Sequence, residues 1–150
     1  MSLSIPADKS GRASKLCADA PSDLRQAVHF FSDPEFCHQL LVAMRWPGGV
    51  PLCTRCGFDR SNYCSTRRVW TCKGCGKQFT VKLGTIFEGS RVGLEKWFPV
   101  VWLKAQPVRT VSFREIADLL GTTHATVWFM FHRIERAMRT GTFLSRSAAA

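Results

Sequence analysis

The sequence has no long hydrophobic run and no apolar leader. Its longest apolar stretches, such as residues 98–103, fall far short of the roughly 18 residues that a membrane-spanning helix needs. The first twenty residues are polar and contain neither an apolar core nor a small-residue cleavage site. We therefore expect a cytoplasmic protein without a membrane partner, whose seven cysteines are reduced and free to bind a metal.

Acidic residues are few in relation to basic ones. Eleven Asp and Glu face 21 Lys and Arg, which gives the 150-residue chain a net charge of +10. Residues 1–44 are close to neutral, whereas residues 45–82 carry one acid, Asp59, among eight basic side chains. These eight are Arg45, Arg55, Arg60, Arg67, Arg68, Lys73, Lys77 and Lys82. Such a surplus predicts a polyanionic partner, with double-stranded DNA as the leading candidate, and no small-molecule substrate.

Two pairs of cysteines form the strongest motif. Cys53 and Cys56 make one Cys-x-x-Cys knuckle, Cys72 and Cys75 make another, and fifteen residues separate the two knuckles. This is the spacing of a zinc site in which four thiolates surround one tetrahedral Zn²⁺. A glycine follows each second cysteine and permits the positive φ of such a tight turn. With short β-prone runs at residues 63–65, 69–71 and 78–81, the sequence predicts a zinc ribbon that holds one structural Zn²⁺.

Other uses of these thiols are open on the sequence alone. A redox pair of the thioredoxin type needs a βαβ pattern beside one knuckle, and a disulfide scaffold needs an oxidising compartment. A catalytic zinc usually has three protein ligands and an open position, whereas four cysteines close the shell. Cys64 could replace a ligand, but it has no knuckle partner, which favours a buried or spare thiol. No role is assigned to Cys17 or Cys37.

Helical patterns flank the ribbon. Residues 1–22 lack hydrophobic periodicity and are expected to form a disordered leader. Residues 23–49 are a helical segment whose helix starts at Asp33 and Pro34 and stops before Trp46. Residues 50–88 are the ribbon, residues 90–140 contain helices predicted over 94–106, 113–120 and 124–139, and residues 141–150 are a truncated linker or tail. The predicted fold is a small α+β protein: a four-cysteine zinc ribbon of short antiparallel strands, followed by an all-α helix-turn-helix module.

The last two predicted helices have the pattern of a DNA-binding helix-turn-helix. Ser112 and Thr123 are placed as N-caps, and Gly121 lies in the turn between the helices. The buried arc predicted for the second helix consists of Val127, Phe131, Ile134 and Met138. Two-helix hairpins in ordinary cores share this pattern, so the basic charge is what favours DNA.

The candidate DNA contacts come from two places, the cationic ribbon and the early and outward positions of the last helix. They are Arg67, Arg68, Lys73, Lys77, Thr123, His124, Thr126, Arg133 and Arg136. On the same helix, Trp128 and Phe129 are equally suited to packing on another module or on a partner subunit, so a homodimer is also open.

Several motifs follow one another in a fixed order over residues 25–140. They are Arg45-Trp46-Pro47, the two knuckles, Lys77-Gln78-Phe79-Thr80-Val81, Gly84-Thr85-Ile86-Phe87, Lys96-Trp97-Phe98 and the run from Trp128 to Ile134. This series resembles the N-terminal part of bacterial zinc-ribbon insertion-sequence transposases. The resemblance implies a DNA-binding front end that recognises the ends of a mobile element, followed in full-length members by an RNase H-like catalytic domain. Two positions depart from the pattern, since Thr54 stands where relatives often have Pro and Ala125 where they often have a basic residue.

No Asp or Glu follows Glu135, so we expect this chain to lack the catalytic domain and to have no enzymatic activity by itself. The first hypothesis is the zinc-dependent DNA-binding part of a transposase. The second is a zinc-ribbon and helix-turn-helix module for transcriptional regulation or protein association, in which the basic charge only solvates the surface. A self-sufficient nuclease or redox enzyme is a third class that no residue pattern favours.

Overall fold

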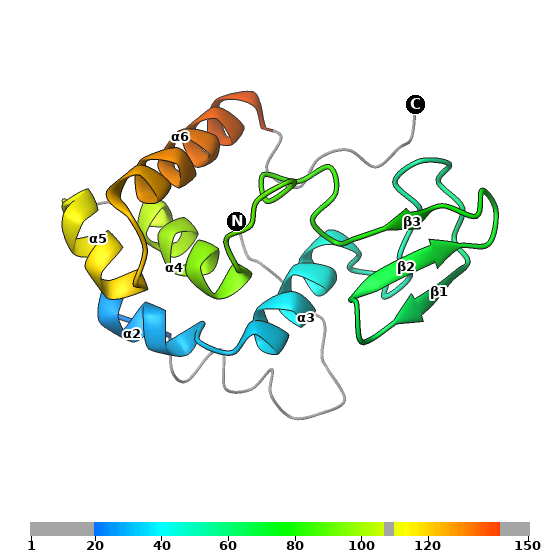
Figure 1. The fold of residues 1–150 in the computed structure, drawn as a ribbon, viewed down its shortest axis with the longest axis horizontal. Coiled ribbons are helices and arrows are strands. Elements are labelled where there is room, and N and C mark those ends of the chain that lie inside the picture. Colours follow the sequence, from blue (N-terminus) through cyan, green and yellow to red (C-terminus); the bar gives the residue numbers. More distant parts are fainter. Residues whose placement is uncertain (1–19, 107–109, 142–150) are drawn as a thin grey trace.

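A computed structural model describes residues 20–106 and 110–141, which form five helices and one three-stranded sheet (Figure 1). The elements in chain order are α2 (Leu24–Phe30), α3 (Pro34–Arg45), β1 (Ser61–Cys64), β2 (Val69–Cys72), β3 (Gln78–Phe79), α4 (Leu94–Ala105), α5 (Phe113–Leu120) and α6 (His124–Thr140). The sheet lies at one end of the molecule, α2, α4, α5 and α6 lie at the other, and α3 lies between them. No helix within the described ranges has both the length and the hydropathy needed to cross a membrane.

The helix starts follow the capping residues of the sequence. The Asp33 carboxylate accepts a hydrogen bond from the Glu35 backbone N–H at 3.0 Å, and Pro34 takes the first helical position. The Ser112 hydroxyl caps α5 and the Thr123 hydroxyl caps α6, and the left-handed Gly121 ends α5. The small α+β class and the starts of these three helices are therefore confirmed.

The structure contains one helix that the sequence did not predict, and the buried stripe of α6 differs from the predicted one. The segment 23–49 contains two helices rather than one, because Asp23 caps the additional helix α2. In α6 the buried stripe is Val127, Met130, Ile134 and Ala137. Met138, predicted to be buried, is 61% exposed, because the buried stripe continues to Ala137 instead. The periodicity of the apolar residues did not show that this small alanine is buried. Of the disordered leader predicted at residues 1–22, residues 1–19 lie outside the described residues.

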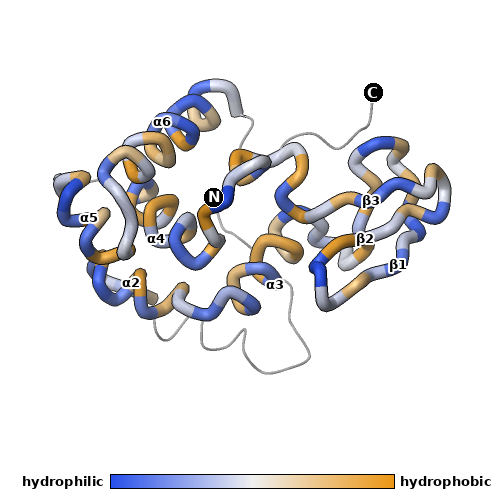
Figure 2. The backbone as a smooth tube through the Cα atoms, in the orientation of Figure 1, coloured by the Kyte–Doolittle hydropathy of each residue, from blue (hydrophilic) through white to orange (hydrophobic). Residues whose placement is uncertain are grey.

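The helical part packs around α4. This helix contacts α2, α3 and α6, while α5 packs against α6 and α2. Its Trp97 is fully buried, and Phe98 stacks on Phe31 from the connection between α2 and α3, with ring centroids 5.4 Å apart. Figure 2 shows apolar stretches of α3 and α4 in the middle of the molecule. One core therefore includes both the helices and the surface to which the sheet is attached.

Aromatic rings attach the sheet to α3. The strands are antiparallel in the order β1–β2–β3, and Trp70 of β2 pairs with Tyr63 on one side and Phe79 on the other. Trp70 lies 5.3 Å from the ring of Trp46 and 5.9 Å from that of His38, both at or in α3. We call these five residues the aromatic seam.

The chain between the sheet and α4 is held from both sides by arginines. Arg45, at the end of α3, donates a hydrogen bond to the carbonyl oxygen of Val81 at 2.5 Å. Arg133 of α6 donates to the carbonyl oxygens of Ile86 and Glu88 at 2.7 and 2.8 Å. Between these anchors, the ring of Phe87 is buried against Trp97. The ribbon and the helices are therefore joined by specific contacts as well as by the chain.

His38 makes the attachment of the sheet sensitive to pH. Its side chain is 6% exposed, and its Nε2 has no hydrogen-bond partner within the described part of the chain. Burial lowers the pKa of His38 below its ordinary 6.5; Glu35 opposes this, and Arg68 and Lys82 add to it. Because the unfolded chain then binds the proton more readily, the stability contributed by neutral His38 is present above pH 6.5 and is lost as the pH falls below it.

We predict that the unfolding free energy decreases from about pH 7 to about pH 5.5 with a contribution from His38 of at most about 1.4 kcal/mol per pH unit. His38→Phe, which keeps a ring in the seam, should reduce this slope. Denaturant unfolding at saturating zinc measures it, and His29→Phe, on an exposed position of α2, is the control. An unchanged slope in His38→Phe would contradict the prediction.

Candidate metal centre

The two cysteine knuckles have the same backbone geometry. In the first, the N–H of Gly57 donates to the carbonyl oxygen of Cys53 at 2.9 Å, and in the second the N–H of Gly76 donates to that of Cys72 at 3.0 Å. Both glycines have a positive φ, 75° and 70°. A side chain at either position would strain this left-handed backbone, so the glycines close turns that other residues fit poorly.

Two further contacts bring the knuckles together. The N–H of Lys73 in the second knuckle donates to the carbonyl oxygen of Arg60, which follows the first knuckle, at 3.0 Å. The ring of Phe58 lies against Gly74, where an added Cβ would meet the ring carbon Cγ at 3.0 Å. The second knuckle therefore needs a residue without a side chain at position 74, which allows the close approach of the first.

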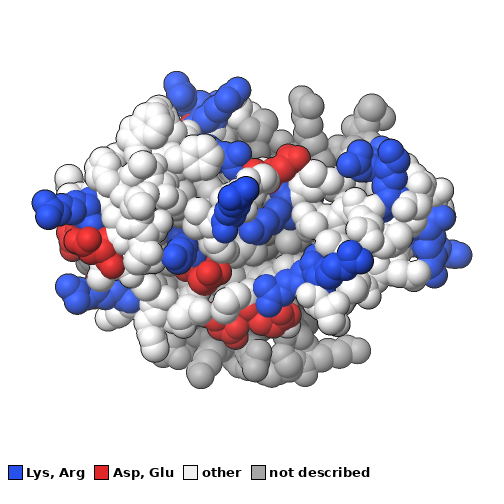
Figure 3. Space-filling model, viewed as in Figure 1, with Lys and Arg blue, Asp and Glu red and all other residues white. Residues whose placement is uncertain are grey.

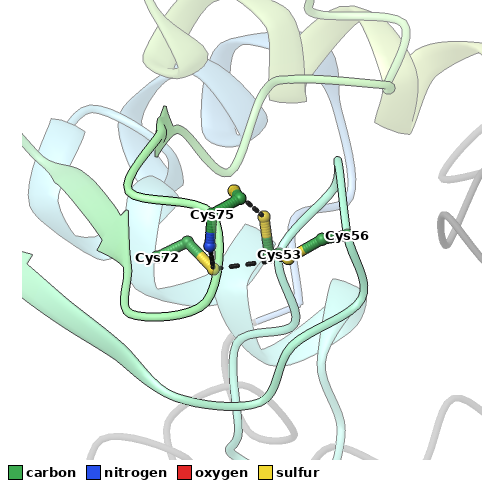
Figure 4. A group of neighbouring side chains, drawn as sticks. All are labelled: Cys53, Cys56, Cys72 and Cys75. Carbon is green, nitrogen blue, oxygen red and sulfur yellow. Dashed lines mark hydrogen bonds between the residues drawn. The ribbon is translucent and has the colours of Figure 1, made fainter.

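The four knuckle thiols converge on one point, as Figure 4 shows. Their sulfur atoms all lie within 4.8 Å of one another. The Sγ atoms of Cys53 and Cys75 are 3.8 Å apart, and those of Cys56 and Cys72 are 3.5 Å apart. Tetrahedral coordination with zinc–sulfur bonds of about 2.3 Å places the sulfurs about 3.8 Å apart. The donor set and its spacing therefore fit a closed four-thiolate zinc shell.

The protein backbone favours thiolates in this group. The N–H of Gly74 points to the sulfur of Cys72 at 3.2 Å, and the N–H of Arg55 points to that of Cys53 at 3.4 Å. Burial raises the pKa of Cys53, but the backbone N–H groups of Cys56 and Arg55 and the neighbouring thiols outweigh burial and bring it from 9.0 to about 7. One sulfur of the group thus ionises near neutral pH.

A second sulfur of the group behaves in the opposite way. The backbone N–H of Phe58 lowers the pKa of Cys56, but hydrogen bonds with Cys72 and the other cluster thiols, together with desolvation, raise it to about 12. Close thiols resist becoming close thiolates, because like charges repel. A divalent cation removes this conflict, since it neutralises half of the charge of four thiolates.

The remaining described cysteines lie outside the group. Cys64 at the end of β1 has its sulfur 3.2 Å from the hydroxyl of Thr66. Cys37 is buried in α3, where its thiol donates to the carbonyl oxygen of Phe31 at 3.2 Å and burial raises its pKa to about 12. The four cysteines of the knuckles are the one group of metal-ligating side chains found in residues 20–106 and 110–141. Cys17 lies outside the described residues.

The four ribbon cations proposed for DNA do not gather at one place. Arg67 and Arg68 lie in the turn between β1 and β2, whereas Lys73 and Lys77 lie in and just after the second knuckle, at the opposite end of β2. Arg68 also pairs with Glu35 of α3 at 3.0 Å. Being largely exposed on both sides, this ion pair contributes little stability.

The predicted contacts on α6 differ in how free their side chains are. The Thr123 and Thr126 hydroxyls are 2.8 Å apart, and Thr123 caps the helix. His124 packs edge-on against Phe113. Arg133 is bonded to two carbonyl oxygens of the chain before α4, a role that no sequence motif indicates, while Arg136 is exposed. The DNA-contact role of all nine residues stays a prediction.

Two similarities to known proteins bear on the knuckles. Residues 32–78 match the model of the transposase zinc-ribbon domain, a segment that runs from the start of α3 to the start of β3. Over 102 residues the chain is 31% identical to a protein in transposable element ISH50 of Halobacterium salinarum, an alignment that covers 66% of this chain and 34% of that protein. The chain therefore spans about a third of the relative's length. No solved structure matches.

We predict that Cys72→Ser loses the metal and unfolds the ribbon, because structural zinc contributes on the order of 10 kcal/mol to a fold of this kind. The measurements are zinc content by mass spectrometry and thermal unfolding by circular dichroism. Cys64→Ser is the matched control, since Cys64 lies on the same hairpin but outside the four-thiol group, and it should keep about one zinc per chain. Equal zinc retention in the two variants would exclude the site.

Proposed function

We propose that this chain is the zinc-dependent DNA-binding part of a transposase and that it recognises mobile-element DNA. The observation that carries the proposal is the four-thiol group, which lies inside the segment that matches the transposase zinc-ribbon domain. One structural Zn²⁺ is bound there by Cys53, Cys56, Cys72 and Cys75. The metal supplies rigidity and no open coordination position, because four thiolates complete its shell.

The distribution of charge supports DNA as the partner. On the face shown in Figure 3, the ribbon end carries Lys and Arg with no acidic side chain beside them. The acidic side chains on this face lie over the helical end and the middle of the molecule. Phosphate neutralisation by such cations supplies affinity that does not depend on sequence. A ribbon fixed by zinc holds its cations in one arrangement and can set the orientation of the duplex.

The two-helix unit supports the same partner. α5 and α6 pack against each other, and residues 121–123 form the short connection between them. We propose that this unit is a DNA-binding helix-turn-helix with α6 in the major groove.

Protein association is the second candidate function. Large apolar side chains are exposed on the ribbon as well as on α6, among them Val50, Phe58 and Tyr63. Exposed aromatic groups are typical of interfaces between proteins. In that case the basic charge only solvates the surface, and duplex DNA would not compete with the protein partner.

We predict that the chain binds duplex DNA with a log–log salt slope near about −5, as expected if about six cations neutralise phosphates. Fluorescence anisotropy with a labelled duplex at increasing salt measures the slope. Removing zinc with a chelator should abolish most of the binding, because the ribbon loses its fold.

A double lysine variant and a single arginine control test where the DNA lies. Lys73→Gln combined with Lys77→Gln should make the slope shallower by about 2, since two phosphate contacts are lost. Arg25→Gln, an exposed position of α2 outside the proposed surface, should leave the slope unchanged. A salt-independent affinity would count against DNA binding and in favour of protein association.

A further inference from the structure

The outward face of α6 has two chemically different halves. At 3.6 residues per turn, the side opposite the buried stripe carries Ala125, Trp128, Phe129, His132, Arg136 and Arg139. On this side the first two turns of α6 are apolar, with Trp128 51% exposed and Phe129 42% exposed. Its later turns are cationic. An exposed pair of large aromatic side chains beside arginines marks a contact surface.

The threonine hydroxyls at the start of α6 are already engaged within the protein. The Thr123 hydroxyl accepts from the N–H of Thr126, and the two threonine hydroxyls lie 2.8 Å apart. The guanidinium of Arg133 lies 4.8 Å from the ring centre of Phe129. However, that guanidinium donates to the carbonyl oxygens of Ile86 and Glu88, so it is already bound to the chain between the sheet and α4.

The first turns also lack the side chains that usually read bases. Residues 123–132 contain no Arg, Lys, Asn or Gln, which are the residues that make bidentate hydrogen bonds to guanine or adenine. What this part of α6 offers to a partner is therefore mainly apolar surface.

The cations on the same face indicate what covers it. Arg136 and Arg139 follow the aromatic pair by two to three turns and are both exposed, in a chain with a net charge of +10. An apolar protein surface would leave these charges unmatched, whereas duplex DNA presents phosphates at the edges of the groove and an apolar group on its floor. That apolar group is the C5 methyl of thymine, which is exposed in the major groove.

We propose that Ala125, Trp128 and Phe129 read thymine methyl groups in the major groove while Arg136 and Arg139 bind the flanking phosphates. The inference rests on the proposed DNA-binding function and adds to it the means of sequence discrimination. The preferred sites contain A·T pairs at the positions under the first two turns of α6, and the contact is made by shape and apolar burial.

Replacing thymine by uracil removes the methyl group and leaves the phosphates and base pairing in place. The zinc-loaded chain is first used to select binders from a random duplex pool, and one enriched duplex is then synthesised with thymine and with uracil. Burial of one methyl group is worth about 0.8 kcal/mol, so each contacted thymine should weaken binding about fourfold when it becomes uracil. The salt slope should be the same for both duplexes.

Variants assign the effect to the aromatic pair. In Trp128→Ala and Phe129→Ala, the ratio of the thymine to the uracil affinity should fall toward one. Met138→Ala removes another exposed apolar side chain of α6, outside this face, and should keep the wild-type ratio. Thermal unfolding by circular dichroism verifies that each variant is folded.

The possible outcomes separate the loss of methyl reading from the loss of DNA binding. Salt-sensitive duplex binding with equal affinity for thymine and uracil overturns methyl reading and leaves DNA binding in place. No binding to any duplex overturns both. A chain that dimerises through Trp128 in sedimentation experiments, with no thymine preference, also overturns the inference and assigns the aromatic pair to a second copy.

Discussion

The convergence of two knuckles on one point is the constraint on which the ribbon depends. Cys56 and Cys72 are separated by fifteen residues, yet their sulfurs lie 3.5 Å apart, so the intervening chain must reverse direction. The hairpin of β1 and β2 provides this reversal. Cys72 is also the last residue of β2, paired with Ser61, so the strand register and the position of a metal-ligating sulfur are set together.

The same strand carries the constraint from the metal centre to the helices. Trp70 and Cys72 are two residues apart and are both buried, as expected for side chains on one face of a strand. Fixing Cys72 therefore fixes the ring of Trp70, which packs against Trp46 and His38 at α3. From α3 the contacts continue through Arg45 to the chain before α4 and through Arg133 to α6. A change in the positions of the cysteine sulfurs should thus alter the position of α6 relative to the ribbon.

Local signals explain why much of this arrangement was predictable. Knuckle spacing and the capping residues Asp33, Ser112 and Thr123 act over three or four residues, and each appears in the structure where the sequence places it. What sequence reasoning missed depends on distant partners. α2 is only seven residues long and is supported by packing on α4 and α5, and the carbonyl partners of Arg133 are more than forty residues away. Backbone carbonyls leave no residue-specific trace in a sequence.

The metal also changes how the charge of the chain should be interpreted. Four thiolates and one Zn²⁺ together carry two negative charges, so a zinc-loaded chain has a net charge near +8 instead of +10. For residues 45–82 the excess falls from seven positive charges to five, close to the four of residues 83–150. Lys73 and Lys77, beside the second knuckle, then partly balance the metal centre itself. The attraction for a polyanion is consequently shared more evenly between ribbon and helices than the sequence charges indicate, which gives the arginines of α6 a larger part in the DNA binding that we propose.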